Sequence, residues 1–480
     1  MEVSQELIPE DPPVSEWQGV LQKVFPFVTK AWWPSWTGHP LAAQITPELD
    51  ALPARGQLPA SVTSWTPLVG KGSLAVLDQG LFAGTNFIVN VLLARWLTPA
   101  EYGAFALAYS VFLLLGTFHT ASLTEPMMVF GPGKYAPHFH EYLGILLRGH
   151  FALMLPGALA LAAAAVVLGR LSSPSVERAF LGLALAAPLI LLLWLVRRAF
   201  YVRLEPGSAA LGGGIYLLIL LAAVRALRST RALSPATGFL AMGLGALAVS
   251  ALLVVRLRPA FALRSVNPTP ATVAADHWRY GRWALASAGV AWFPSNIYFV
   301  LLPAWFALEA AGALKALMNL AMPPLHSIGA LSGILLPVLV RNRQAGGIRS
   351  MNRTLRLALA IFLSGSALYV VLLWSFRLQL FQLLYAGKYR EYGGWPLLLV
   401  GLLPFAASAT MVLGCGLRAL ERPDTIFWCY VGSAVVTVLV GVPLITGIGV
   451  AGALLAVLLS SLAAGALMLW FYLRFLRREA

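Results

Sequence analysis

Residues 71–103, KGSLAVLDQGLFAGTNFIVNVLLARWLTPAEYG, are the stretch from which the rest of the chain can be understood. Their first part, residues 72–96, is apolar over a length that exceeds the roughly 20 residues a helix needs to cross a bilayer. Gly80 and Gly84 form a GxxxG pair, a spacing that allows another helix to approach closely. The stretch therefore predicts a membrane-spanning helix with helical neighbours.

Polar side chains interrupt this apolar helix. Gln79, Asn86 and Asn90 share one helical face, since each residue advances by about 100°, and Asp78 lies one step round from them. A carboxylate within a spanning helix is disfavoured by about 2.5–3.5 kcal/mol on insertion scales. We therefore expect this face to line a protein interior or a wet cavity rather than lipid.

The composition of the whole chain is that of a membrane protein. Of 480 residues, 59% are hydrophobic and 11% are charged, whereas soluble domains carry about 25% charged residues. The net charge of +15 could also indicate nucleic-acid binding, but membrane topology explains it better at this hydrophobicity, so we expect no nucleic-acid partner. The two cysteines, Cys415 and Cys429, suggest neither a disulfide framework nor a metal site.

Apolar segments follow one another from residue 71 with short breaks, and they predict an all-α polytopic membrane protein with about twelve transmembrane helices. The expected spans are 72–96, 104–130, 141–168, 179–200, 207–226, 234–256, 280–305, 311–340, 354–376, 394–417, 424–446 and 448–475. The longest break, near 257–279, divides them into two groups of six. We expect a first lobe at 71–257, a cytoplasmic linker at 258–279 and a second lobe at 280–480.

Arginines and lysines are distributed unevenly between alternate breaks. One side carries twenty of them and the other side carries eight. The positive-inside rule places the first side, and with it both termini, in the cytoplasm. Residues 1–70 hold seven acidic and three basic residues, many prolines and five tryptophans. Their acidic start leads us to expect no signal peptide. We expect a largely disordered cytoplasmic tail, or alternatively a segment whose tryptophans lie on the membrane interface or dock a partner.

Two pairs of segments indicate an internal repeat. LLARWLTPAEYG (92–103) aligns with LLPAWFALEAAG (301–312), and RLEPGSA (203–209) aligns with LERPDTI (420–426). These alignments pair Gly103 with Gly312 and Pro206 with Pro423. Because each half begins and ends on the same side, the halves would be related by a pseudo-two-fold axis along the membrane normal. Chance similarity between apolar segments is the alternative.

The pattern resembles a known superfamily. The helix LDQGLFAGTNFIVNVLLARWLTPAEYG and later stretches such as LTEPMMVFGP (123–132), LVRRAFYVRLEPGSAALGG (195–213) and LYAGKYREYGGWPLLLVGLLP (384–404) resemble bacterial polysaccharide flippases of the Wzx type. These belong to the multidrug/oligosaccharidyl-lipid/polysaccharide (MOP) exporter superfamily. The resemblance implies two six-helix lobes in a MATE-like fold around a central cavity, alternating access, and an undecaprenyl-pyrophosphate-linked oligosaccharide carried to the outer leaflet of the bacterial inner membrane.

Such a substrate needs cations for its phosphates and amides for its sugars. Lys315, Asn319 and His326 lie on one stripe of the eighth span, which Pro323 and Pro324 interrupt. Lys315 could instead snorkel to the outer interface, and His326 could be a neutral core histidine. The remaining candidate cavity residues are Gln79, Asn86, Asn90, Arg148, Arg282 and Asn296.

Charges of both signs occur near the cytoplasmic ends of several spans, where they could form a gate. Asp78 and Glu125 are the candidates for gating or ion coupling, and Arg148 and Arg282 are suited to bidentate contact with pyrophosphate. Without a Walker A or HExxH motif, we expect no cofactor, no bound metal and no ATP hydrolysis, and a proton or sodium gradient is a possible energy source.

Three functions are compatible with this sequence. The first is the flippase, with lipid-linked oligosaccharide and membrane lipids as partners and, by resemblance, a polysaccharide polymerase and glycosyltransferases. The second is an ion-coupled multidrug exporter, for which Asp78 would be the acidic site. The third is a membrane polysaccharide polymerase or ligase, which the short outward breaks disfavour. The first two are transporters rather than enzymes.

Overall fold

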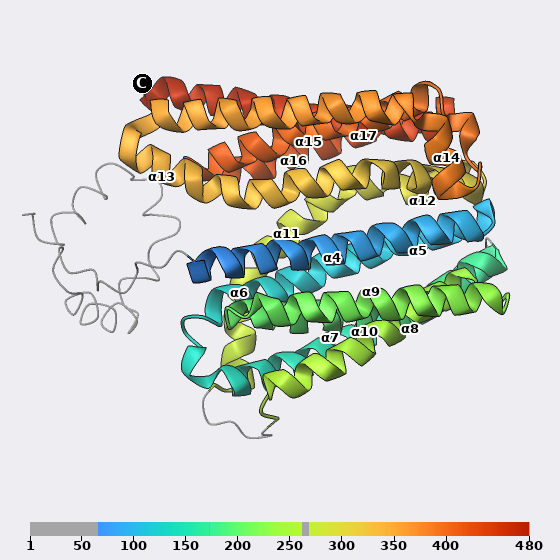
Figure 1. Cartoon of the computed structure of the whole chain (residues 1–480), viewed down its shortest axis with the longest axis horizontal. Coiled ribbons are helices and arrows are strands. Elements are labelled where there is room, and N and C mark those ends of the chain that lie inside the picture. The colour runs from blue at the N-terminus through green and yellow to red at the C-terminus, as the bar shows by residue number, and fades with distance from the viewer. Residues whose placement is uncertain (1–65, 172, 262–267, 480) are drawn as a thin grey trace, which may run out of the picture. The chain divides into compact units, whose positions relative to one another are not determined.

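The computed structural model describes residues 66–171, 173–261 and 268–479, and every secondary-structure element in them is a helix (Figure 1). The predicted tail, apart from its last residues, lies outside the described residues. The elements are α4 (Thr66–Trp96), α5 (Pro99–His119), the π-helix η1 (Thr120–Thr124), α6 (Glu125–Phe130), η2 (Ala136–His138), α7 (Phe139–Leu171), α8 (Pro174–Val202), α9 (Pro206–Ser229), α10 (Pro235–Leu257), α11 (Pro270–Asn296), α12 (Tyr298–Trp305), α13 (Leu308–Ser375), α14 (Arg377–Tyr385), η3 (Arg390–Tyr392), α15 (Trp395–Ala419), α16 (Pro423–Val436), the π-helix η4 (Thr437–Gly441) and α17 (Val442–Glu479).

These helices provide twelve segments that can cross a membrane. Nine helical runs of the described residues are long and apolar enough, and α11 with α12, bent by 43°, forms a tenth span. Two of the nine are double: the 68-residue α13 would be about 100 Å long if straight, far more than one bilayer. Non-helical backbone at Gly346 and Gly347 folds α13 back on itself, as Figure 1 shows. The second double run is Asp424–Arg477, which comprises α16, η4 and most of α17 and is divided by non-helical backbone at Ile448 and Gly449. The prediction of about twelve helices is confirmed.

Proline and hydroxyl side chains define where several helices begin. α5, α8, α9, α10, α11, α15 and α16 carry proline in their first turn, where a missing backbone N–H removes no helical hydrogen bond. Thr98 caps α5 and forms a reciprocal capping box with Glu101, and Ser234 does the same with Thr237 at α10. α11 begins at Pro270, so the second part of the predicted linker is helical.

The spans pack as two groups joined along one seam. In the first group α8 packs against α7, α9 and α10, and in the second α15 packs against α13 and α17. The seam is formed by α5 against α13 and by α11 against η1 and α5. In Figure 1 the start of α4, the hairpin of α13 and the end of α17 lie at one end of the helices, which we call the arginine-rich end because α8, α10 and α15 finish there in arginine-bearing turns.

The seam is closed at the opposite end. A β-carbon on Gly103 would lie 1.8 Å from the carbonyl oxygen of Leu308, so only glycine allows α5 and α13 to cross here. Lys388 adds hydrogen bonds to the carbonyl oxygens of Arg95 (2.9 Å) and Leu97 (2.6 Å). The close approach expected at Gly80 and Gly84 is wrong, because no atom lies within 4 Å of a β-carbon built at either residue.

The second repeat match corresponds to two turns with the same backbone. Leu204 and Glu421, which the alignment pairs, both have left-handed φ, at 56° and 61°. One residue later, the amides of Glu205 and Arg422 donate to the carbonyl oxygens of Phe200 and Leu417, at 2.8 and 2.9 Å. α9 and α16 then begin at the paired prolines. This agreement favours the internal repeat over chance similarity.

Candidate functional site

Asp78, on α4, is a fully buried carboxylate in a built polar site. Arg197 Nη2 on α8 donates to Asp78 Oδ1 at 2.6 Å, and the Tyr201 hydroxyl donates to Asp78 Oδ2 at 2.6 Å. The guanidinium carbon of Arg197 lies 4.1 Å from the centre of the Phe82 ring, which adds a cation–π contact. The carboxylate is thus neutralised within the first group of helices.

A small cavity of about 180 Å³ adjoins this ion pair. Gln79, from the predicted polar face of α4, lines it together with Asp78. The other lining residues are Phe82, Thr120, Thr124, Trp194, Arg197, Arg198 and Tyr201. Thr120 and Thr124 bound η1, and π-helical turns of this kind are frequent at functional sites.

A larger cavity of about 840 Å³ lies between the two groups of helices. Glu125 and Asn296, both predicted, line it with Arg418 and aromatic residues of α8, α11 and α16. Asn296 also donates its amide to the carbonyl oxygen of Trp292, at 3.1 Å. The full lining is Leu113, Gly116, Thr117, Thr120, Ala121, Glu125, Trp194, Ala284, Ser287, Ala288, Ala291, Trp292, Ser295, Asn296, Arg418, Ile426, Phe427 and Tyr430. The cavity offers hydroxyls, amides and aromatic faces, which suit a sugar, and one charge of each sign.

Lys315 and Asn319 are buried in the seam between α13 and α5. Lys315 Nζ lies 4.3 Å from the centre of the Tyr109 ring, and no carboxylate pairs with it among the described residues. Asn319 donates its amide to the Tyr102 hydroxyl at 2.9 Å. Lys315 therefore does not snorkel to an interface. It also lies 6.0 Å from the centre of the Phe299 ring on α12, and Asn319 also interacts with Tyr385 on α14, so these contacts are with α5, α12 and α14 rather than with the polar face of α4.

The remaining predicted residues are more dispersed. Asn86 and Asn90 donate their amides to backbone carbonyls one turn earlier in α4, at 3.1 and 2.8 Å, and Asn90 is buried. His326 and Arg282 are exposed, and Arg148 is partly exposed. The cation that pairs with Asp78 is Arg197, which was not among the residues of the predicted gate.

A buried histidine pair was not predicted. His119 Nε2 on α5 lies 2.9 Å from His150 Nδ1 on α7, and His150 Nε2 lies 3.0 Å from the carbonyl oxygen of Pro188. A carbonyl only accepts, so in the neutral pair His150 carries its hydrogen on Nε2 and accepts one from His119. His119 Nδ1 then has no partner in the described chain. The two histidines are 31 residues apart, so no local spacing could reveal them.

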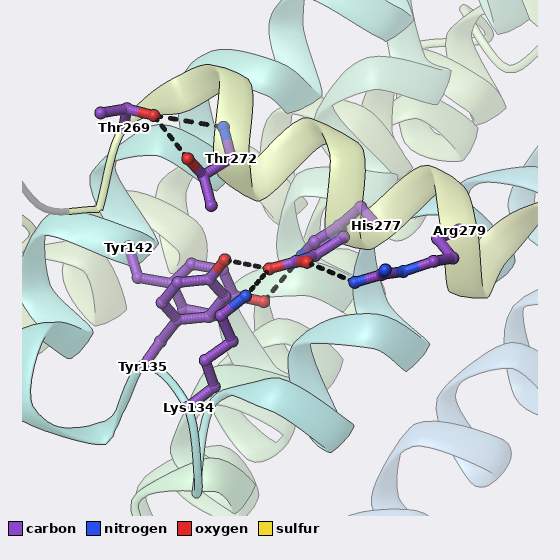
Figure 2. Close-up of polar contacts among 8 residues, drawn as sticks. Lys134, Tyr135, Tyr142, Thr269, Thr272, His277 and Arg279 are labelled. Carbon is purple, nitrogen blue, oxygen red and sulfur yellow. Dashed lines mark hydrogen bonds and ion pairs between the residues drawn. The ribbon is translucent and has the colours of Figure 1, made fainter. Parts of the chain in front are cut away.

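The start of α11 is fastened to the first group by a cluster outside the spans (Figure 2). Asp276 accepts from Lys134 and the Tyr135 hydroxyl at one oxygen and from Arg279 at the other, at 3.2 Å. His277 donates to the Ser122 carbonyl oxygen at 2.9 Å. Burial acts to raise the pKa of Asp276, but its hydrogen bonds and the neighbouring cations hold that pKa below the ordinary value.

The fold is that of MOP superfamily transporters. An inward-facing multidrug-resistance MATE transporter superposes with a TM-score of 0.69 at 12% identity, covering 83% of this chain and 98% of the other. The lipid II flippase MurJ in its inward closed conformation superposes with a TM-score of 0.65 at 12% identity, covering 84% of this chain and 87% of the other. A MOP superfamily transporter from Pyrococcus furiosus, described by the reverse polarity of its binding pocket, superposes with a TM-score of 0.60 at 13% identity, covering 85% of this chain and 94% of the other.

These likenesses concern the fold alone. No protein-family model matches the sequence, and no curated protein matches it. The structures named here are transporters or flippases rather than enzymes. The chain is a multi-pass membrane protein whose fold is similar to that of MOP transporters.

Proposed function

We propose that this protein is a flippase that moves an undecaprenyl-pyrophosphate-linked oligosaccharide across the bacterial inner membrane. The observation that carries the proposal is Lys315, a cation buried in the seam without a carboxylate partner in the described residues. Lys315 lies two turns into α13, and burying its ammonium group without an anion costs several kcal/mol, of which a desolvated cation–π contact returns about 2 kcal/mol. The difference is reduced when an anionic group of the substrate reaches Lys315.

The charges of the two candidate sites favour an anionic substrate over a cationic one. Asp78, which a cation exporter would need, is occupied by Arg197 and Tyr201 in this conformation. The 840 Å³ cavity contributes Glu125 and Arg418, so it adds no net negative charge. Lys315 is therefore the uncompensated buried charge of the region, and its sign matches pyrophosphate.

The arrangement of the seam supports alternating access. α5 and α13 are in backbone contact at the opposite end, near Gly103 and Leu308, whereas the 840 Å³ cavity extends to Arg418 at the arginine-rich end. With the arginine-rich end in the cytoplasm, as the charge distribution predicts, this conformation is open to the cytoplasmic leaflet, where such a lipid is made. Opening the glycine contact would then expose Lys315 on the other side.

The second candidate is an ion-coupled multidrug exporter. The observation in its favour is the buried Asp78 beside a cavity, because a protonatable carboxylate in a span can bind a proton, a sodium ion or a cationic drug. In the flippase, the same residue is the candidate for coupling to a proton or sodium gradient. A partnership with a polysaccharide polymerase and glycosyltransferases belongs to the first candidate only.

Proteoliposomes with a dye-labelled undecaprenyl-pyrophosphate oligosaccharide test the proposal, with translocation measured as the fraction reached by a membrane-impermeant quencher. We expect Lys315→Ala to lower the rate about 10- to 100-fold, the loss of one charge-assisted contact, and Lys315→Arg to retain part of it. Arg349→Ala, an exposed cation on the same long helix, is the control and should leave the rate unchanged. A wild-type rate in Lys315→Ala, or transport of cationic dyes instead of the lipid, would overturn the proposal.

A further inference from the structure

Two adjoining cavities lie at the arginine-rich end, away from the seam, between the start of α9 and the end of α10. Their volumes are about 610 and 590 Å³, within the range of about 300–1,000 Å³ usual for ligand sites. Arg203, Ser208, Leu211 and Arg256 line both, so the two form one groove, which we call the α9–α10 groove. Its other lining residues are Leu74, His140, Leu204, Glu205, Pro206, Gly207, Gly212, Leu252, Leu253, Val255 and Arg258.

One end of the groove is cationic. Arg203, Arg256 and Arg258 line it, and the single carboxylate there, Glu205, pairs with Arg203 at 2.9 Å. Neither Arg256 nor Arg258 forms an ion pair within the described residues. His140 Nδ1 donates to the carbonyl oxygen of Arg258 at 2.9 Å and so fixes the turn that carries this arginine. Arg256 and Arg258 are both exposed, so the groove presents two cations that have no ion-pair partner among the described residues.

The N-terminus of α9 adds to this positive end. Its N-cap residue, Glu205, makes no side-chain capping hydrogen bond, and the first residues of the helix line the groove. Pro206 has no N–H and the Ser208 amide donates to the Glu205 carbonyl oxygen at 3.1 Å, so the Gly207 amide and the helix dipole are what this end offers a phosphate oxygen. The arginines and the N-terminal end of α9 therefore both present positive charge, which favours an anionic group such as phosphate.

The rest of the groove is apolar and continues onto the lipid-facing surface. Leu211 on α9 is 56% exposed, and Leu252 and Val255 on α10 are 52% and 75% exposed. α9 and α10 are both long and apolar enough to be membrane spans, so these side chains face acyl chains rather than water. A ligand of this groove must therefore join an anionic head to hydrocarbon.

We infer that the α9–α10 groove binds one anionic glycerophospholipid from the cytoplasmic leaflet. Its phosphate would contact Arg256, Arg258 and the start of α9, and its acyl chains would lie along Leu211, Leu252 and Val255. An inorganic anion would leave the apolar wall uncovered, and an uncharged lipid would leave the arginines without a partner. The groove shares no lining residue with the 840 Å³ cavity, so this lipid is separate from the transported substrate.

Native mass spectrometry of the full chain, released from detergent containing phosphatidylglycerol and phosphatidylethanolamine, tests this inference. The charge variant is Arg256→Gln/Arg258→Gln, and its matched control is Arg349→Gln/Arg353→Gln, two exposed arginines of α13. A third variant, Leu211→Trp, fills the groove without changing its charge. We expect the charge variant to bind the tightest phosphatidylglycerol about 25-fold more weakly, taking about fivefold for each arginine near an anionic headgroup.

The outcomes separate the possible ligands. Retention of one phosphatidylglycerol by the wild type and the control, and its loss from both groove variants, supports the inference. Equal retention in the charge variant and the control overturns it, as does displacement by inorganic phosphate at the same concentration as the lipid. Preference for phosphatidylethanolamine also overturns it, because a zwitterionic headgroup does not require two unpaired arginines. None of these results depends on transport, so they stand apart from the proposed function.

Discussion

Gly103 and Gly312, which the internal repeat places at equivalent positions, pack against each other where α5 crosses α13. A β-carbon on Gly312 would lie 3.0 Å from the Gly103 amide nitrogen and 2.7 Å from the carbonyl oxygen of Pro99. A β-carbon on Gly103 would meet Leu308, the residue that the alignment pairs with Pro99. The contact is thus reciprocal, as in a two-fold symmetric interface, and it lies near the axis relating the two halves.

This relationship predicts opposite effects for two glycine-to-alanine substitutions. Gly103→Ala places a methyl group 1.8 Å from a backbone oxygen, so the helices must separate, and we expect a loss of about 1–3 kcal/mol. Gly84→Ala meets no atom within 4 Å and should be neutral or stabilise by up to about 1 kcal/mol, because alanine favours helix. Thermal unfolding in detergent measures both. Equal effects of the two substitutions would contradict the described contact.

The Asp78–Arg197 pair predicts non-additive substitutions. Asp78→Asn or Arg197→Met leaves one buried group without its partner, which costs about 3–5 kcal/mol for pairs of this kind. The double variant removes both charges. We expect it to lose less stability than the sum of the losses in Asp78→Asn and Arg197→Met. The measurement is the midpoint of thermal unfolding for the four chains of the cycle.

Arg198→Met is the control for this cycle, because Arg198 is the next residue on α8 and also lines the small cavity. Combined with Asp78→Asn, it should show additive effects. Additivity in the Asp78 and Arg197 cycle itself would mean that the pair carries little interaction energy, and the neutralisation of Asp78 would then be a weak argument against a cation site.

The cluster at Asp276 predicts a dependence on acid pH. Its pKa in the folded state is lowered, so the ionised carboxylate stabilises the fold above the ordinary pKa of about 3.9, and this stabilisation is lost as the pH falls through the folded value. We expect Asp276→Asn to be less stable at neutral pH and less sensitive to acid. Asp424→Asn, at an exposed carboxylate without an ion pair in the described residues, should keep the acid sensitivity. Unfolding midpoints between about pH 7 and 3 provide the test.

The fold was largely predictable because bilayer crossing imposes a strong pattern on sequence. Long apolar runs and the prolines at their edges located the twelve spans, and the repeat located Gly103 and Gly312 before their contact was known. The pair at Gly80 and Gly84 had the same local composition but contacts no helix, because a small residue permits close packing without requiring it. Continuation of helix to Pro270 was missed because α11 begins outside the apolar segment.

The sequence predicted which single residues belong to the candidate site, but it did not predict which of them contact each other. Asp78 was correctly expected to avoid lipid, since a carboxylate in a span must do so, and it is fully buried. Its partner Arg197 lies 119 residues away. In the sequence it entered only the count of basic residues that predicts the orientation in the membrane. His119 and His150 were separated in the same way. Such pairs depend on which faces of distant helices meet, and that information is not contained in a local pattern.

The last prediction concerns access to the seam. In a chain with Cys415→Ala and Cys429→Ala, we expect a cysteine at Asn296, in the 840 Å³ cavity, to react with a membrane-impermeant maleimide in inside-out vesicles and not in right-side-out ones. A cysteine at Asn319 should be unreactive in both, because Asn319 is 2% exposed and lies below the contact of Gly103 with Leu308. Adding Gly103→Ala should make the cysteine at Asn319 reactive in right-side-out vesicles, since the seam is then forced open at the opposite end.

Two outcomes would contradict this prediction. Labelling of Asn296→Cys in right-side-out vesicles alone would reverse the predicted orientation. Labelling of Asn319→Cys without the glycine substitution would show that the contact between Gly103 and Leu308 does not close the path.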